Sequence, residues 1–206
     1  MSTAKNNILE KIRMALATPT PLPFPAAEGT ANPFQPPAQD WVVEFAEQFS
    51  ALQGKFIFCL NEGELMQSLT KLFQQHEWTK IYCQEEKLRG LIPSNSLSED
   101  IANCEASVTS CEGLVARTGS ILLSSAQGRV PSVYAPIHIC VAYTSQLVYD
   151  IKEGLEKISE KYKDGFPSLI TLATGPSRTA DIEKTLVVGV HGPKEVYCFV
   201  IDDQPQ

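Results

Sequence analysis

Short apolar runs alternate with amphipathic segments from residue 41 onward. Residues 41–52 and 62–77 carry apolar side chains at helical spacing, whereas the runs at 55–60 and 80–83 are short and mostly apolar, as buried strands are. A strand, a helix and a second strand in this order are typical of parallel strands joined by a crossover helix. The alternation therefore predicts an α/β fold, with a mainly parallel sheet flanked by helices. Further apolar strands are predicted at 120–124, 137–143, 168–173 and 195–201.

Other segments of this region are less regular. Residues 106–110 are expected to form a loop or a strand, and residues 126–134 a loop. Thr144 or Ser145 is expected to cap a long helix that ends near Tyr162. The inward-facing side chains of that helix are predicted to be Val148, Ile151, Leu155 and Ile158.

A Pro-rich segment separates the N-terminus from the α/β region. Seven prolines fall within residues 18–40, which favours an extended linker over regular structure. Residues 1–17 are predicted to form a helix with Ile8, Ile12 and Leu16 on one stripe. A lone helix cannot bury such a stripe, so we expect it to dock on the body, on a second copy of the chain or on a partner. The α/β domain is predicted to span residues 41–206.

Charge and hydropathy exclude two classes of protein. The net charge is -7 and the pI is about 5.0, whereas nucleic-acid binding requires a basic face. No apolar run approaches the roughly 18 residues of a membrane span, and the charged N-terminus does not resemble a signal peptide. We therefore expect a cytoplasmic protein.

The six cysteines show no metal-ligand spacing. Four of them lie within predicted strands, where a cysteine is usually a small buried apolar residue. Cys104 and Cys111 lie in a loop-rich region and would pair only in an oxidising medium. No spacing matches a zinc site or an iron–sulfur cluster, so we expect reduced thiols and no metal site.

Two of the three histidines, His138 and His191, lie where they could contact a metal ion or a ligand. His138 and Cys140 lie two apart in a predicted strand and so share a sheet face. This pair fits either a metal site or a buried, hydrogen-bonded histidine, of which the second is the more common arrangement. His191 lies in a Gly-Pro turn and is expected to reach water or a ligand.

The run Gly175-Pro176-Ser177-Arg178-Thr179-Ala180-Asp181-Ile182-Glu183 is unusually dense in polar side chains. It follows the predicted strand 168–173, and Ser177 is expected to cap a following turn or helix. Open α/β sheets bind ligands beyond the C-terminal ends of their strands, so these groups are candidate ligand contacts. The alternative is a capped helix start with solvated charges.

Two further motifs are candidates. Thr118-Gly119-Ser120 brings two hydroxyls and a glycine directly before a predicted strand, where a backbone can approach a ligand closely. Gly128-Arg129 lies in a predicted loop between strands, and its guanidinium is suited to an anion. The alternatives are an ordinary turn and a solvated arginine.

The polar run, followed by Gly189-Val190-His191-Gly192-Pro193, resembles the C-terminal signature of the LUD-domain family, in particular its lactate utilization protein C type. Thr118-Gly119-Ser120, Pro136-Ile137-His138-Ile139 and the leading helix with its irregular tether also resemble that family. The resemblance covers roughly residues 41–201. It implies an α/β fold similar to the group of sugar-phosphate isomerases, CoA-transferases and folate cyclo-ligases. Arg117 departs from the family pattern, in which an acidic residue is expected before Thr-Gly.

The resemblance also implies a function. Better-known members serve L-lactate oxidation together with two iron–sulfur sister proteins, so this chain is expected to be a subunit that binds a small anionic or nucleotide-like ligand. The resemblance leaves both the cofactor and the catalytic residues unknown. The alternatives are a stand-alone enzyme on a sugar-phosphate or acyl-CoA type substrate, with Asp181 or Glu183 as base or nucleophile, and a non-catalytic assembly subunit.

The hypothesis of a ligand-binding subunit gives each candidate site residue a role. Arg178 or Arg129 would face a carboxylate or phosphate, and Asp181 and Glu183 would orient Arg178, bind ribose-type hydroxyls or hold a divalent cation. Hydroxyl and backbone groups would supply further contacts to the ligand. These are contributed by Gly175, Ser177, Thr179, Thr118, Gly119 and Ser120.

Overall fold

The computed structural model describes residues 3–17, 37, 39–179 and 187–203. The chain divides into two compact units, residues 1–36 and 37–206. In the first unit, helix α1 (Thr3–Leu16) coincides with the predicted N-terminal helix. Most of the predicted Pro-rich linker lies outside the described residues.

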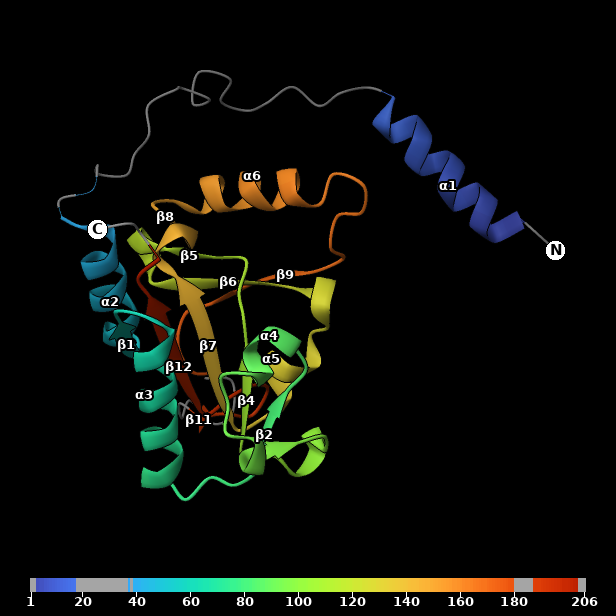
Figure 1. Ribbon diagram of the computed structural model, residues 1–206. Helices are drawn as coiled ribbons and strands as arrows, with labels where there is room; N and C mark the ends of the chain where they lie inside the picture. The colour runs from blue at the N-terminus through green and yellow to red at the C-terminus, as the bar shows by residue number, and fades with distance from the viewer. Residues whose placement is uncertain (1–2, 18–36, 38, 180–186, 204–206) are drawn as a thin grey trace. The chain divides into compact units, whose positions relative to one another are not determined.

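A six-stranded parallel sheet forms the centre of the second unit (Figure 1). Its long strands, β7 and β12, are the apolar runs that the sequence predicts, and burial on both faces explains their continuous apolar character. The α/β fold with a mainly parallel sheet is thus confirmed. In spatial order the strands are β1 (Lys55–Cys59), β12 (Glu195–Ile201), β7 (Ile137–Tyr143), β4 (Ala106–Thr109), β2 (Ile81–Cys83) and β3 (Leu97–Ser98).

A second sheet packs on one face of the central sheet. Within it β6 pairs antiparallel with β5 and β9, and β5 pairs in parallel with β8. Its strands, in spatial order, are β8 (Leu147–Val148), β5 (Gly113–Val115), β6 (Ser120–Ser124) and β9 (Ile170–Ala173). A separate antiparallel pair consists of β10 (Arg178–Thr179) and β11 (Val187–Val188).

Helices and short 3₁₀ turns connect these strands. Side chains cap two of the helices: Asp40 accepts from the Val42 amide at the start of α2, and Asn61 accepts from the Glu64 amide at the start of α3. The α-helices of this unit are α2 (Trp41–Ala51), α3 (Glu62–Gln75), α4 (Glu86–Arg89), α5 (Val130–Tyr134) and α6 (Ile151–Lys161). The 3₁₀ turns are η2 (Ser94–Ser96), η3 (Ile101–Asn103), η4 (Ala116–Thr118), η5 (Ser125–Gln127) and η6 (Thr144–Gln146).

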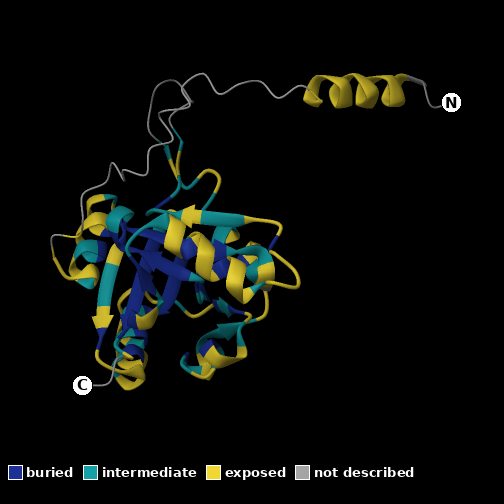
Figure 2. Cartoon of the chain, turned by 90° about the horizontal axis from the view of Figure 1, so that it is seen from above, coloured by how far each residue is buried: buried dark blue, intermediate teal, exposed yellow. Residues whose placement is uncertain are grey.

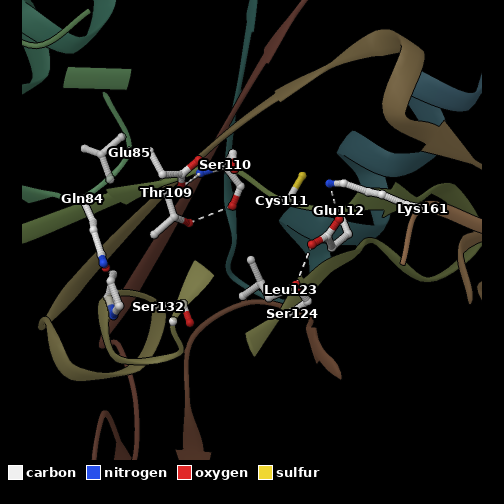
Figure 3. A pocket seen from close by; sticks show the side chains of 13 residues that line it. Gln84, Glu85, Thr109, Ser110, Cys111, Glu112, Leu123, Ser124, Ser132 and Lys161 are labelled. Atoms are coloured by element: carbon white, nitrogen blue, oxygen red, sulfur yellow. Dashed lines mark hydrogen bonds and ion pairs between the residues drawn. The ribbon is translucent and has the colours of Figure 1, made fainter. Parts of the chain in front are cut away.

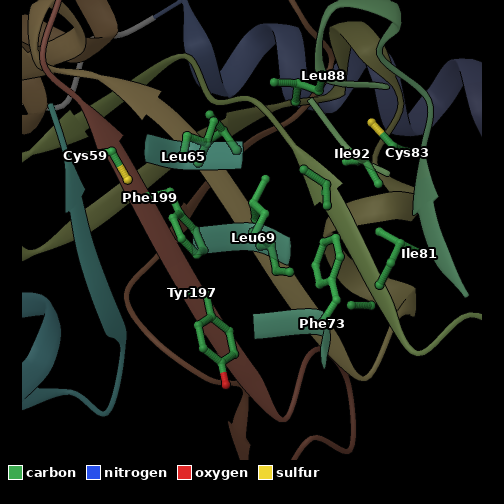
Figure 4. Close-up of a cluster of buried hydrophobic side chains, with 14 of the residues drawn as sticks. Cys59, Leu65, Leu69, Phe73, Ile81, Cys83, Leu88, Ile92, Tyr197 and Phe199 are labelled. Carbon is green, nitrogen blue, oxygen red and sulfur yellow. The ribbon is translucent and has the colours of Figure 1, made fainter. Parts of the chain in front are cut away.

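The buried side chains form layers on either side of the central sheet, and Figure 2 shows them concentrated in its strands. On one face, α3 packs Leu65, Leu69 and Phe73 against Tyr197 and Phe199 of β12 (Figure 4). The opposite face packs against α2 and the second sheet through a further cluster. The outer face of the second sheet is covered by α6.

Two predictions about irregular regions were wrong. The helix expected from Thr144 or Ser145 begins only at Ile151, because Leu147 and Val148 are buried and pair with β5 instead. Part of the loop expected at 126–134 is helical, in η5 and α5.

The prediction of which α6 side chains face inward was only partly right. Ile158 is buried, but Leu155 is 39% exposed. The apolar stripe of α6 is therefore narrower than its spacing predicts.

All six cysteines are free and buried, as the strand placement of four of them predicts. Across the described residues, no helix is both long and apolar enough to cross a membrane.

Candidate functional site: a cationic cleft and an acidic pocket

The segment that follows β9 runs along the N-terminal ends of the central strands. The Ser177 amide donates to the Pro193 carbonyl (2.9 Å), and the Gly189 amide donates to the Ser177 carbonyl (2.9 Å). The Lys194 amide, next to β12, donates to the Pro136 carbonyl at the start of β7 (2.7 Å). The expectation that this segment lies at the C-terminal edge of a parallel sheet was therefore wrong. It treated β9 as a parallel strand, whereas β9 belongs to the mixed second sheet.

The turn or helix that Ser177 was expected to cap does not begin at Arg178. Arg178 and Thr179 are extended and form β10, which pairs with β11. The two predicted carboxylates, Asp181 and Glu183, lie outside the described residues. Their roles stay predictions.

Gly175 and Arg178 hold the C-terminal end of α2. Gly175 has a φ of 93°, and a Cβ at this position would lie 2.4 Å from the Leu52 carbonyl oxygen. The Arg178 Nη2 donates to the same oxygen at 2.6 Å. Leu52 is the C-cap of α2, and the last carbonyls of a helix have no partner within it. Arg178 thus has a structural contact in addition to its predicted role toward an anion.

The Thr118-Gly119-Ser120 turn also packs against α2. Gly119 has a φ of 60°, and a Cβ there would lie 2.4 Å from the Phe49 amide nitrogen. The Thr118 and Ser120 hydroxyl oxygens are 2.8 Å apart, and Ser120 Oγ is 2.9 Å from Thr174 Oγ1. Only through Thr174 does this chain of hydroxyls reach the cleft described below.

Arg117, which precedes this turn, forms an ion pair. Its Nε lies 2.9 Å from Asp150 Oδ2, and its Nη2 lies 3.2 Å from Oδ1. The hydrogen bond from Arg117 lowers the pKa of Asp150, the N-cap residue of α6. Arg117 is thus paired with the residue that precedes the first turn of α6.

Arg129 is the N-cap residue of α5, and hydrogen bonds hold the start of this helix in place. The buried Ser107 on β4 donates its hydroxyl to the Pro131 carbonyl at 2.5 Å, and Ser132 donates to the Arg129 carbonyl at 3.0 Å. The Arg129 side chain is exposed. The structure gives its guanidinium no ion pair or hydrogen bond with a described residue.

These segments enclose a cleft of about 440 Å³, which we call the Arg129 cleft. It brings together four of the predicted site residues, Arg129, Gly175, Ser177 and Arg178; Thr118, Gly119, Ser120 and Thr179 are outside its lining. Of the described residues that line it, none is acidic, so its charged groups favour an anion. The polar lining residues are Arg129, Ser132, His138, Thr171, Thr174, Ser177, Arg178 and His191.

His138 contributes a neutral ring to the wall of this cleft. It is 1% exposed, and its Nε2 lies 2.8 Å from Thr109 Oγ1, which agrees with the expected buried, hydrogen-bonded histidine. Burial lowers the pKa of His138 to about 4. The ring is therefore uncharged at neutral pH.

An acidic pocket lies at the C-terminal ends of β2 and β4 (Figure 3), and we call it the Glu112 pocket. Glu85 accepts from the Ser110 amide (2.7 Å) and from the Ser110 hydroxyl (2.5 Å). Glu112 accepts from Ser124 Oγ (2.5 Å) and from Lys161 Nζ (2.8 Å). At about 50 Å³ the pocket has room for roughly a few water molecules.

Glu112 is ionised despite its burial. Desolvation alone would raise its pKa, but hydrogen bonds from Lys161, Ser124 and Tyr162 hold the pKa of Glu112 below its ordinary value. Its oxygens are already occupied by three donors, which suits a structural anchor between α6 and the second sheet.

None of the predicted site residues lies in this pocket. A signal was present in the sequence, because Glu85 follows a predicted strand, and Cys111 and Glu112 follow the segment 106–110 predicted as a loop or strand. Lys161 could not be foreseen, because it comes from α6, about fifty residues further along the chain.

The described residues contain no group of three or more His, Cys, Asp or Glu side chains that could hold a metal ion. The two cavities share the wall formed by Leu123 and Ser132. Their combined chemistry is therefore a cationic cleft next to a small, internally paired acidic pocket.

A family model described as the LUD domain matches residues 90–201, just over half of the chain. Lactate utilization protein C from Deinococcus radiodurans is 34% identical over 105 residues, which cover 50% of this chain and 49% of that protein. The protein of the same name from Bacillus licheniformis is 38% identical over 101 residues, 47% of this chain and 42% of that protein. The chain thus spans about half the length of the curated relatives it matches.

A solved structure shows the same fold. The crystal structure of a DUF162 family protein from Deinococcus radiodurans superposes with a TM-score of 0.61 at 19% identity. The match covers 78% of this chain and 96% of that chain. At this identity the likeness concerns the fold alone.

Proposed function

Because the chain belongs to the LUD domain family, we propose that it acts in lactate utilization as a subunit that binds a small carboxylate in the Arg129 cleft. Its relatives from Deinococcus radiodurans and Bacillus licheniformis are named for lactate utilization. We further propose a cytoplasmic setting and iron–sulfur partner proteins for the oxidation itself.

The observation that carries this proposal is the charge of the cleft. Arg129 is exposed and its guanidinium has no partner among the described residues, and no described lining residue is acidic. A guanidinium can bind a carboxylate through two parallel hydrogen bonds. Ser177 and His191 lie in the same cleft and add further polar contacts.

The rival proposal, a stand-alone enzyme on a sugar-phosphate or acyl-CoA type substrate, has some support in the Glu112 pocket. That pocket lies at the C-terminal ends of parallel strands, where such enzymes place their ligands. Against it, Glu112 already accepts from three donors, and its lowered pKa makes it a weak base. We therefore favour the binding subunit.

Titration calorimetry with L-lactate, pyruvate and inorganic phosphate tests the proposal directly. Arg129→Ala is expected to weaken carboxylate binding by about tenfold or more, the loss typical of one charge-assisted contact. Lys71→Ala removes one positive charge from an exposed position on α3 and is the matched control, which should leave binding unchanged.

Activity separates the subunit from the enzyme. Lactate-dependent dye reduction is expected only when the iron–sulfur partner proteins are added. Turnover by the purified chain alone would support the rival enzyme, and unchanged carboxylate affinity in Arg129→Ala would remove the role of the cleft.

A further inference from the structure

A second cavity adjoins the Arg129 cleft, and we call it the Tyr134 cavity. Its volume is about 600 Å³, and four residues line both spaces: Arg129, Val133, His191 and Gly192. The two spaces therefore lie next to each other along these residues. L-lactate is far smaller than the cleft of about 440 Å³ alone, so it would fill only a small part of the combined space.

The Tyr134 cavity has an apolar wall that faces solvent. Val130 is 54% exposed, Tyr134 is 60% exposed and Val190 is 43% exposed. Pro131 of α5 is buried, so Val130 and Tyr134, which lie four residues apart on this helix, share its outer side. Val190 comes from the turn that precedes β12. Single exposed apolar side chains are common on protein surfaces, but several gathered at one place mark a binding surface.

The charges of the two spaces favour an anion at their junction. No described residue that lines either space is acidic, and Arg129 lines both. Its guanidinium attracts a carboxylate, whereas the wall of Val130, Tyr134 and Val190 is suited to an apolar group. A ligand with a carboxylate at one end and an apolar group at the other is therefore complementary to both spaces.

We infer that the Tyr134 cavity binds an apolar substituent of the carboxylate held by Arg129, so that the ligands of this site are organic acids with an aryl or branched alkyl group. The apolar group lies against Tyr134, Val130 and Val190. An aromatic substituent can in addition stack on the Tyr134 ring. The inference rests on the proposed function, because it takes carboxylate binding at Arg129 as given.

The apolar contact that this requires is small. A tenfold gain in affinity corresponds to about 1.4 kcal/mol, which needs roughly 55 Å² of apolar surface to be removed from water. An aromatic side chain buries about 150–250 Å² when it is fully covered. A phenyl group that is only partly covered, as in an open cavity, is therefore sufficient.

Titration calorimetry of the full chain at neutral pH compares L-lactate with L-phenyllactate, two acids that differ only in the phenyl group. The wild-type chain is expected to bind L-phenyllactate about tenfold more tightly than L-lactate. In Tyr134→Ala this difference should shrink by about threefold or more, while the affinity for L-lactate stays as it is. Tyr134→Phe keeps the ring and should keep the difference. Arg129→Ala should weaken the binding of both acids.

Val130→Ser gives a second, independent arm. It removes apolar surface from the same wall without changing the charge, so it should also reduce the difference between the two acids. Val43→Ser is the matched control, because Val43 is an exposed valine of α2 that lines neither space, and both affinities should stay unchanged. Thermal unfolding shows whether each variant is folded, and Val130→Ser decides the matter if Tyr134→Ala is not.

The outcomes distinguish this inference from the proposed function. Equal wild-type affinity for the two acids, with both weakened by Arg129→Ala, would overturn the inference and leave the cleft as a site for small carboxylates. The exposed apolar wall would then be left for a partner protein. A difference that survives in both Tyr134→Ala and Val130→Ser would also overturn it. If the wild-type chain binds neither acid, the proposed function fails, and the inference fails with it.

Discussion

At Gly119 the backbone adopts a left-handed conformation, and α2 leaves no space for a side chain. A Cβ there would lie 2.4 Å from the Phe49 amide nitrogen. We expect Gly119→Ala to lower the free energy of unfolding by roughly 2 kcal/mol or more, through backbone strain and the displacement of α2.

Urea denaturation of that variant provides the measurement. Gly165→Ala is the matched control, because no atom lies within 4 Å of the position of its added Cβ. The control should be neutral or slightly stabilising. Equal stability of the two variants would show that Gly119 is not needed for the docking of α2.

The lowered pKa of Glu112 implies that the stability of the fold depends on pH. Its folded pKa lies below the ordinary value of 4.5, so its ionised form stabilises the fold above that pH. The stabilisation is lost as the pH falls through the lowered pKa. Glu112→Gln should therefore be less stable than the wild type by roughly 1 kcal/mol at pH 7, and the difference should shrink below pH 4.5.

The measurement is the free energy of unfolding as a function of pH. Glu160→Gln changes an exposed carboxylate of α6, next to Lys161 in the sequence, and serves as the control. If the difference between Glu112→Gln and the wild type stays constant with pH, the three donors to Glu112 do not stabilise its charged form.

At the scale of the elements, the contact between β10 and α2 distinguishes the two arginines that line the Arg129 cleft. Arg178 donates to the C-cap carbonyl of α2, whereas the guanidinium of Arg129 contacts no described residue. Arg178→Ala is expected to lower the free energy of unfolding by about 1 kcal/mol, since the contact is exposed to solvent. Arg129→Ala should leave it unchanged.

Denaturant unfolding and lactate titration of both variants complete this comparison. Arg129→Ala should affect binding only, and Arg178→Ala should affect stability whether or not it also affects binding. An Arg178→Ala variant as stable as the wild type would show that the contact with the Leu52 carbonyl does not stabilise α2.

For the whole molecule, the second unit is expected to fold without the first. Every buried residue of the three core clusters lies within residues 45–201, so none comes from the N-terminal unit. We expect deletion of residues 1–36 to leave a cooperative thermal transition. It should alter self-association or partner binding, because α1 carries an apolar stripe that includes Ile8 and Ile12.

Light scattering, and pull-down with the proposed iron–sulfur partner proteins, measure that change. In the full chain, Ile12→Glu should reproduce the effect of the deletion, whereas Lys5→Glu changes charge on the same helix without touching an apolar residue. If neither association changes, α1 has no role in assembly.

The sequence by itself determined four strands of the central sheet, β1, β2, β7 and β12, and the helices α2 and α3. The runs that became β1, β7 and β12 are apolar along most of their length, and α3 shows its buried stripe at helical spacing. These patterns are local. A strand buried on both faces shows a continuous apolar run, and a helix buried on one side shows apolar residues three or four positions apart. The buried, hydrogen-bonded His138 was likewise anticipated from its residue type and its place in a strand.

Only the tertiary structure decided how the cavities are assembled. Leu147 and Val148 form a strand because β5 is available beside them, and Arg178 contacts Leu52, which lies more than a hundred residues earlier. The Arg129 cleft is built from α5, β9 and the turn before β12, and its position at the N-terminal ends of β7 and β12 follows from the pairing of β9 with β6. Such pairings depend on partners distant in sequence, which no local pattern of residues encodes.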